Sequence, residues 1–252
     1  MSAKPILEVT GLSRSFGGIK AVDGATFSLG ENEVLGVIGP NGSGKTTLVN
    51  LLTGFVKPDS GKVVFQGRDI TGFKPYKVAA LGIARSFQMV KPFYELPAFK
   101  NLVVPLYSHR VHGLAGGRYG DRESVAKDLL EEVGFERDSS VITQQAASLP
   151  HGYLKRLELA KCMALEPELY VLDELFSGLS LAEVASLVPV IEKLIAQGKT
   201  IVMVEHRLRE LFRIATKVIV LNFGRVIAEG PPEQVMQAHE VRQAYLGTEA
   251  EG

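Results

Sequence analysis

Short runs of apolar residues, each bounded by glycine, proline or polar residues, alternate along the chain with longer amphipathic stretches. Such runs are typical of strands buried on both faces, and they occur at 34–38, 169–172, 200–204 and 218–221. Apolar residues repeat with helical spacing at 182–197 and 208–215. This alternation of strand and helix predicts an α/β fold with a largely parallel sheet.

The two ends of the chain carry additional, shorter signals. Residues 6–9 and 62–65 are predicted strands, and the Gly17-Gly18 pair is predicted to form a turn between strands. Pro75 opens a short helix that stops at Gly82, and Ile83 begins a new segment. Near the C-terminus, 222–225 is a hairpin-type turn, and a final helix begins at Pro231.

The middle of the chain has a different pattern. Three prolines and a glycine-rich, loop-like stretch at 113–117 interrupt it, and a helical pattern at 125–133 ends at Gly134. A further helix opens at 149–153 and carries the charged residues Lys155, Arg156 and Lys161. We interpret 89–165 as an inserted helical subdomain, and 1–88 and 166–252 as the α/β core of the same domain.

The segment after the strand at 34–38 fits the phosphate-binding pattern G-x-x-x-x-G-K-[ST], and a helical pattern follows it. Glycines let successive backbone N–H groups converge on phosphate oxygens, and a helix N-terminus favours an anion. Lys45 supplies a charge for the β- and γ-phosphates, and the Thr46 hydroxyl is placed to bind Mg²⁺. The predicted nucleotide-binding residues are Gly39, Pro40, Asn41, Gly42, Ser43, Gly44, Lys45, Thr46 and Thr47.

Two acids, Asp173 and Glu174, follow the predicted strand at 169–172. Ligands bind at the carboxyl ends of the strands in open α/β sheets. Downstream of a phosphate-binding loop, we expect Asp173 to hold Mg²⁺ and Glu174 to act as general base on the attacking water. His206 follows the strand at 200–204 and would reach the same edge, where it either bonds a γ-phosphate oxygen or is a structural histidine.

Two other residues are ambiguous on the local sequence alone. Phe16, ahead of the phosphate-binding loop, either stacks on a purine base or belongs to the core. Gln88, taken by itself, reads as a surface residue.

Composition and charge limit the partners and locations that we expect for this chain. The 252 residues include 28 basic and 28 acidic side chains, and this balance gives no reason to expect nucleic acid as the partner. The lone cysteine, Cys162, lies in an apolar helical pattern and is expected to be buried. No signal peptide and no apolar run long enough for a membrane span is evident, so we expect a cytoplasmic, non-spanning chain. The spacing of His109, His112, His151 and His239 suggests no zinc site.

Four segments together carry a family resemblance. They are 16–18 with Ala21 and Val22, Gly82-Ile83-Ala84-Arg85-Ser86-Phe87-Gln88, Val204-Glu205-His206, and 241–247. With the phosphate-binding loop, they make the chain similar over nearly its full length to ATP-binding subunits of ABC transporters. Within these, it most resembles the ATPase subunits of branched-chain amino-acid importers.

The resemblance implies a fold and residue roles. The fold would be a P-loop, RecA-like core with an N-terminal antiparallel β-subdomain and an inserted helical subdomain, and the cofactors would be ATP and Mg²⁺. Phe16 would stack on adenine with Val22 beside it, Gln88 would touch Mg²⁺ or the attacking water, and His206 would sense the γ-phosphate. Leu149 and Gly152 belong to the signature segment, which would contact the ATP held by a second subunit in a head-to-tail dimer.

The resemblance also implies partners. These are two multi-spanning permease subunits, a second ATP-binding subunit that is identical or related, and a solute-binding protein, with this chain on the cytoplasmic face of the inner membrane. The 89–102 region, with Arg85, Lys91, Phe93 and Tyr94, would receive the permease's coupling helix.

This sequence departs from the family pattern at four positions: Pro150 replaces a serine, Tyr153 a glutamine or glutamate, Leu175 a proline and Ser180 an aspartate. The departures weaken the expectation of contacts to the second subunit's ATP. They leave intact the hydrolytic set, which consists of Lys45, Thr46, Gln88, Asp173, Glu174 and His206. A lipid or lipopolysaccharide export ATPase, or a soluble ABC-type ATPase acting on nucleic acid or ribosomes, remains the alternative.

Overall fold

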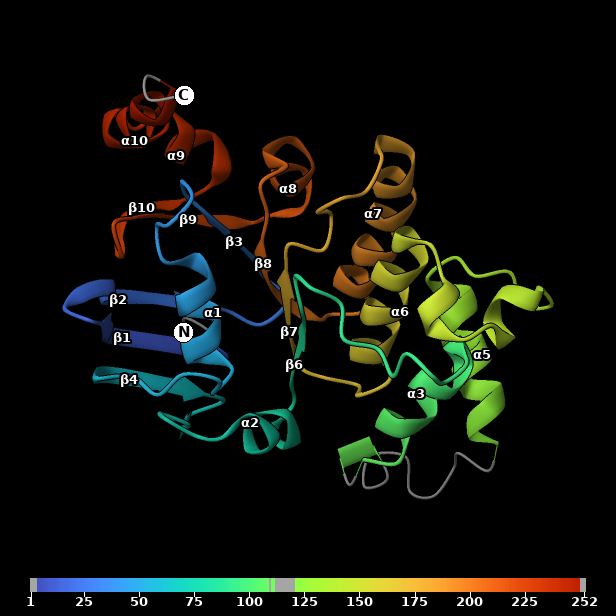
Figure 1. Cartoon of the computed structure of the whole chain (residues 1–252). Coiled ribbons are helices and arrows are strands. Elements are labelled where there is room, and N and C mark those ends of the chain that lie inside the picture. The colour runs from blue at the N-terminus through green and yellow to red at the C-terminus, as the bar shows by residue number, and fades with distance from the viewer. Residues whose placement is uncertain (1–3, 109, 112–120, 250–252) are drawn as a thin grey trace.

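The computed structural model describes residues 4–108, 110–111 and 121–249. The glycine-rich stretch 113–117 and two of the histidines considered above, His109 and His112, lie outside the described residues. Two sheets and a set of helices make up the fold (Figure 1). No helix within the described residues is long and apolar enough to cross a membrane.

The larger sheet has six strands in the order β10-β9-β3-β8-β7-β6. Its strands β6, β7, β8, β3 and β9 are parallel, and β10 pairs antiparallel with β9. The strand bounds are β3 Val34–Ile38, β6 Ile83–Ser86, β7 Leu169–Asp173, β8 Thr200–Val204, β9 Lys217–Asn222 and β10 Arg225–Gly230. The predicted α/β class and its parallel core strands are confirmed.

The smaller sheet is antiparallel, in the order β2-β1-β4-β5. Its strands are β1 Leu7–Phe16, β2 Ile19–Leu29, β4 Ser60–Phe65 and β5 Arg68–Asp69. The turn predicted at Gly17-Gly18 joins β1 and β2, and both glycines have positive φ. This sheet is the antiparallel subdomain that the resemblance implies.

The helices divide between the two faces of the larger sheet. Helix α1 (Lys45–Leu52) lies between the two sheets, where its apolar residues pack with those of β1, β3 and β8 (Figure 1). On the opposite face, α6, α7 and α8 join α3 and α5 in a second cluster. The remaining helix bounds are α2 Pro75–Leu81, α3 Ala98–Leu106, α5 Arg122–Glu132, α6 His151–Met163, α7 Leu181–Ala196, α8 Leu208–Ile214, α9 Pro232–Gln237 and α10 His239–Glu249, with 3₁₀ turns at Ser140–Thr143 and Ala146–Ser148.

Strand periodicity explains why the central strands contain runs of successive apolar residues. In β8, Ile201 and Met203 pack in the cluster on one face, whereas Val202 and Val204 pack in the cluster on the other. Successive side chains of a strand point to opposite faces, so a strand covered on both sides needs an unbroken apolar run. Cys162 is buried in the second cluster, among α3, α5, α6, α7 and α8, as predicted, and burial raises the pKa of its thiol.

The inserted segment differs in part from expectation. Helix α3 forms at two of the three prolines that interrupt this segment: Pro97 is its N-cap, and Pro105 lies in its last turn. Proline fits the start of a helix because the first N–H groups have no intrahelical partner. Helices α3, α5 and α6 contribute to the same apolar cluster as α7, and the division at residues 89 and 165 stays a prediction.

Helix α7 offers a matched test of this packing. Leu187 is fully buried, whereas Leu181 at the start of the same helix is 74% exposed. We expect Leu187→Ala to lower the free energy of unfolding by about 2–5 kcal/mol, and Leu181→Ala to change it by less than about 0.5 kcal/mol. Urea denaturation of the two variants measures the difference, and equal effects would contradict the assigned core.

Candidate nucleotide and hydrolysis site

The phosphate-binding loop joins the carboxyl end of β3 to the N-terminus of α1. Gly44 is the N-cap of α1 with φ of 106°, and Gly39 has φ of 149°. A Cβ at Gly39 would lie 2.1 Å from the Leu221 carbonyl oxygen, and one at Gly44 would lie 2.2 Å from the Ala21 carbonyl oxygen. Glycine is therefore required at both positions by neighbouring backbone, in addition to any approach by a phosphate.

A hollow of 320 Å³ lies over this loop. Its lining combines the loop with residues from β2, from the segment after β6 and from the ends of β7 and β8: Ala21, Asn41, Gly42, Ser43, Gly44, Lys45, Thr46, Thr47, Gln88, Glu174 and His206. The first N–H groups of a helix have no intrahelical partner, so the start of α1 offers donors here. The hollow brings most of the predicted site residues together.

Lys45 is held at the base of the loop. Its Nζ donates to the carbonyl oxygens of Gly39 at 2.8 Å and Pro40 at 2.9 Å, and only 6% of the residue is exposed. Burial lowers the pKa of Lys45, while the negative charges of Glu174 and Asp173 act in the opposite direction. The loop therefore fixes the ammonium group next to the hollow.

Glu174 connects the other predicted catalytic residues. Its Oε2 accepts a hydrogen bond from Gln88 Nε2 at 2.8 Å, and its Oε1 lies 3.1 Å from His206 Nε2. Glu174 has φ of 50°, a left-handed backbone that a non-glycine residue adopts only when its surroundings hold it there. The 2.9 Å hydrogen bond from its amide to the Val204 carbonyl supplies part of that restraint.

The parallel pairing of β7 and β8 produces this meeting. Asp173 is the register partner of Val204, so the residues after each strand emerge side by side. The expectation that the strand before His206 lies parallel to the Asp173 strand is confirmed. His206 is about half exposed at the side chain and points to the same hollow as Glu174.

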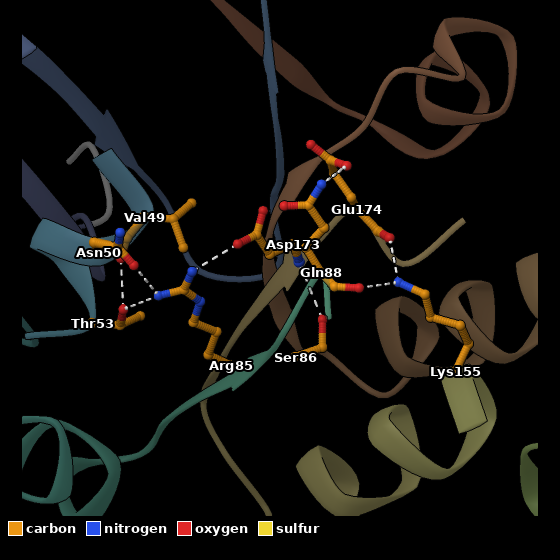
Figure 2. A network of polar contacts seen from close by, with 9 residues as sticks. All are labelled: Val49, Asn50, Thr53, Arg85, Ser86, Gln88, Lys155, Asp173 and Glu174. Carbon is orange, nitrogen blue, oxygen red and sulfur yellow. Dashed lines mark hydrogen bonds and ion pairs between the residues drawn. The ribbon is translucent and has the colours of Figure 1, made fainter. Parts of the chain in front are cut away.

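Asp173 is buried, and only one of its two carboxylate oxygens has a hydrogen-bond partner among the described residues. Its Oδ2 forms a 2.7 Å ion pair with Arg85 Nη2, and its amide donates to Ser86 Oγ at 3.1 Å (Figure 2). Its Oδ1 is buried with no hydrogen-bond partner among the described residues. An orphaned carboxylate oxygen next to a phosphate-binding loop fits a cation or its water as the missing partner.

Two residues near the N-terminus, Phe16 and Val22, are predicted to lie at the nucleotide base. Phe16 is 46% exposed and lies under the Arg14 guanidinium at 4.8 Å, so the alternative that it belongs to the core is wrong. Val22, expected beside Phe16, is fully buried in the core, and its contact with the nucleotide stays a prediction. Side chains alternate along β2, so the neighbouring Ala21 lines the hollow instead.

The signature segment does not line this hollow. Leu149 is buried, and a Cβ at Gly152 would lie 2.0 Å from Glu183 Oε1. The departures from the family pattern have local explanations. Pro150 is the N-cap of α6, Tyr153 packs edge-on against Phe135, Leu175 is core, and Ser180 caps α7 in a capping box with Glu183.

Lys155 is a site residue that the sequence analysis missed. It was placed among the charged residues of its helix, but only 1% of it is exposed. Its Nζ donates to the backbone carbonyls of Gln88 at 2.8 Å and Glu174 at 2.9 Å (Figure 2). Helix α6 is thereby tied to Gln88 and Glu174, and burial lowers the pKa of this lysine.

Glu205, just before His206, is also buried, and its Oε1 accepts a 2.8 Å hydrogen bond from the Phe176 amide. Burial raises the pKa of Glu205 from 4.5 to about 7, against the effect of nearby Lys155. The folded pKa is above the unfolded one, so the stability this group contributes is complete below pH 4.5 and is lost as pH rises through about 7.

We therefore expect Glu205→Gln to flatten the pH dependence of stability. The amide oxygen of glutamine still accepts from Phe176 but does not ionise. Relative to wild type, the variant should gain about 2–3 kcal/mol of unfolding free energy between pH 5 and pH 8. Urea denaturation at both pH values measures this. Glu136→Gln, at an exposed position, is the matched control, and parallel curves for wild type and Glu205→Gln would contradict the burial argument.

Comparisons with known proteins extend these observations. Residues 22–177 match the ABC transporter family model, and residues 225–251 match that of the branched-chain amino acid ATP-binding cassette transporter. The chain is 37% identical over 255 residues to the high-affinity branched-chain amino acid transport ATP-binding protein BraF of Pseudomonas aeruginosa, covering 97% of this chain and 99% of the relative.

Solved structures share the fold. A nucleotide-free ATP-binding cassette from an ABC transporter superposes with a TM-score of 0.82 at 30% identity, covering 96% of this chain and 99% of the other. A dimeric ATP-binding cassette bound to ADP and Pi, in a post-hydrolysis state, superposes with a TM-score of 0.78 at 22% identity, covering 90% and 98%.

Proposed function

Because the chain belongs to the family of ABC transporter ATP-binding subunits, we propose that it hydrolyses ATP to energise uptake of a branched-chain or related hydrophobic amino acid. The similarity to BraF over nearly the whole of both chains, and the C-terminal match to the branched-chain family, favour import over the lipid-export and nucleic-acid alternatives. The observation that carries the hydrolytic role is the meeting of Gln88, Glu174 and His206 beside the phosphate-binding loop.

The hydrolytic step follows from the position of each group. The amides at the start of α1 and the Lys45 ammonium would bind the β- and γ-phosphates and stabilise the charge of the transition state. Glu174 would accept the proton of the attacking water, since its carboxylate lines the hollow over the phosphate-binding loop. Gln88 and His206 hold this carboxylate from two sides and would orient the water between them.

Thr46 and Asp173 would hold Mg²⁺, and Gln88 would contact the ion or the attacking water. When bound, it would neutralise charge on the β- and γ-phosphates. The described residues contain no group of three His, Cys, Asp or Glu side chains that could hold a metal ion. In nucleotide sites, Mg²⁺ usually has one or two protein ligands, and phosphate oxygens and water complete its coordination.

The base assignment has a direct test. Glu174→Gln keeps the shape and the hydrogen-bonding oxygen but removes the proton acceptor, so ATP turnover should fall by about 10²–10⁴-fold with nucleotide affinity retained. Phosphate release and equilibrium binding measure the two quantities. Glu168→Gln, at a carboxylate paired with Arg110, is the matched control, and near-normal turnover in Glu174→Gln would remove Glu174 as the base.

The signature segment supports a dimeric arrangement. Leu149 and Gly152 lie outside the hollow of their own chain, so they are proposed to contact ATP bound to a second subunit, identical or related, placed head to tail. The N-terminus of α6, a helix of 13 residues, would supply amides to the γ-phosphate in place of the missing serine hydroxyl. Two ATP molecules would then hold the dimer closed until hydrolysis.

An apolar groove is the proposed docking site for one of two multi-spanning permease subunits at the cytoplasmic face of the inner membrane, with a solute-binding protein on the other side. The groove has a volume of 270 Å³ and includes Phe55, Tyr76 and Phe87. Lys91 Nζ lies 4.9 Å from the Phe87 ring, and the exposed Phe93 and Tyr94 follow in the chain. An apolar helix end of the permease fits such a surface.

Arg85, one of the predicted docking residues, also lines this groove. Its side chain is only 8% exposed, and its guanidinium is bound to Asp173, Asn50 and Thr53. The guanidinium lies 5.3 Å and 5.0 Å from the centroids of the Phe55 and Phe87 rings, and a part for Arg85 in docking the permease stays a prediction.

The docking surface can be tested with two exposed tyrosines. Tyr76 lines the groove and is 66% exposed, whereas Tyr107 is 64% exposed and does not line it. Tyr76→Asp should reduce co-purification with the permease subunits by at least about tenfold, because it places a charge in an apolar contact. Tyr107→Asp should leave co-purification unchanged, and equal losses would contradict the assigned groove.

A further inference from the structure

Arg85 contacts both Asp173, the proposed metal ligand, and the aromatic rings of the apolar groove. It is on β6, one residue before Ser86, and its side chain crosses toward α1 (Figure 2). Nη2 bonds Asp173 Oδ2 at 2.7 Å, and Nη1 bonds Asn50 Oδ1 at 2.7 Å and Thr53 Oγ1 at 3.1 Å. One guanidinium therefore joins three elements of the core: β6, β7 and the helix of the phosphate-binding loop.

This contact decides which oxygen of Asp173 is free. Arg85 Nη2 donates to Asp173 Oδ2, and Ser86 Oγ accepts a hydrogen bond from the Asp173 amide. These two neighbouring residues of β6 therefore fix both the side chain and the backbone of Asp173. Oδ1 is left as the buried oxygen without a partner. Outer groups that orient a metal ligand in this way influence metal affinity strongly.

The other side of the guanidinium faces aromatic rings. The Arg85 Cζ atom lies 5.3 Å from the centroid of Phe55 and 5.0 Å from that of Phe87. The two rings contact each other edge-on at 5.4 Å, and both line the groove. A ring that shifts when the groove is filled would therefore change the position of the cation resting against it.

We propose that Arg85 is a positioning residue that aims Asp173 Oδ1 at the Mg²⁺ site and transmits occupation of the Phe55–Phe87 groove to that site. The first part depends on the nucleotide site alone. The second rests on the proposed function, because it takes the groove as the permease contact. The route differs from Gln88, which acts on Glu174 and not on the metal aspartate.

Arg85 should have two opposite effects on the affinity for Mg²⁺, and an experiment can separate them. Orientation of Asp173 strengthens metal binding, whereas a nearby positive charge weakens it. Loss of an outer-shell partner typically lowers metal affinity by about 10–100-fold. We expect orientation to dominate, because Arg85 Nη2 fixes Asp173 Oδ2 at 2.7 Å and its loss would let the carboxylate turn away from the metal.

The test is a Mg²⁺ titration of nucleotide binding to the full chain, followed with a fluorescent ATP analogue. Arg85→Met should raise the Mg²⁺ concentration needed for half-maximal tightening by about tenfold or more, with affinity in EDTA changed by less than about twofold. Arg85→Lys should recover part of the loss, because its ammonium reaches Asp173 but lacks the second arm toward Asn50. This variant also retains the charge pair if Arg85→Met fails to fold.

Phe55→Ala tests the link to the groove in both backgrounds. It should shift the Mg²⁺ midpoint by about two- to threefold in the wild type and cause no further shift in Arg85→Met, as expected for residues that act through one another. An unchanged or lower midpoint in Arg85→Met and Arg85→Lys would overturn the positioning role. Equal shifts from Phe55→Ala in both backgrounds would overturn the transmission role. Absence of any nucleotide binding by the wild-type chain would instead refute the proposed function.

Discussion

The hydrogen-bonded register between β7 and β8 is the constraint on which the site depends. It sets Asp173 opposite Val204, and the Glu174 amide continues the pairing to the Val204 carbonyl. A shift of one residue would turn the side chains of β7 to the opposite face of the sheet. The buried apolar clusters on both faces prevent such a shift, so packing far from the hollow determines where the two acids point.

The elements that could be predicted from the sequence are those whose signal is local. The strands at β3, β7 and β8 are unbroken apolar runs, and the phosphate-binding loop has its residues in fixed order between a strand and a helix. The missed features depend on partners distant in the chain. Lys155 meets a carbonyl 67 residues away, and Arg85 meets a carboxylate 88 residues away, so neither contact leaves a local pattern.

Val22 and α3 illustrate two other limits. The motif singles out Val22, but the alternation along β2 buries Val22 in the core and leaves the neighbouring Ala21 to line the hollow. Helix α3 forms despite Pro97 and Pro105 because both occur near its ends, and the side chain of buried Asn101 supplies contacts to the surrounding loop backbone. Residue type alone predicts neither feature. The burial of Val22 depends on the alternation of side chains along a strand, and the helix depends on where each proline lies within it.

The glycines of the phosphate-binding loop have a further consequence. Gly39 and Gly44 are pressed against carbonyl groups of β9 and β2, and Gly224 donates its amide to the carbonyl of Ser43. The loop thus takes its shape from strands that surround it, and the conformational entropy of ordering it is lost when the chain folds. A triphosphate that enters meets a preorganised cradle, so little of its interaction energy is consumed in arranging the backbone that receives it.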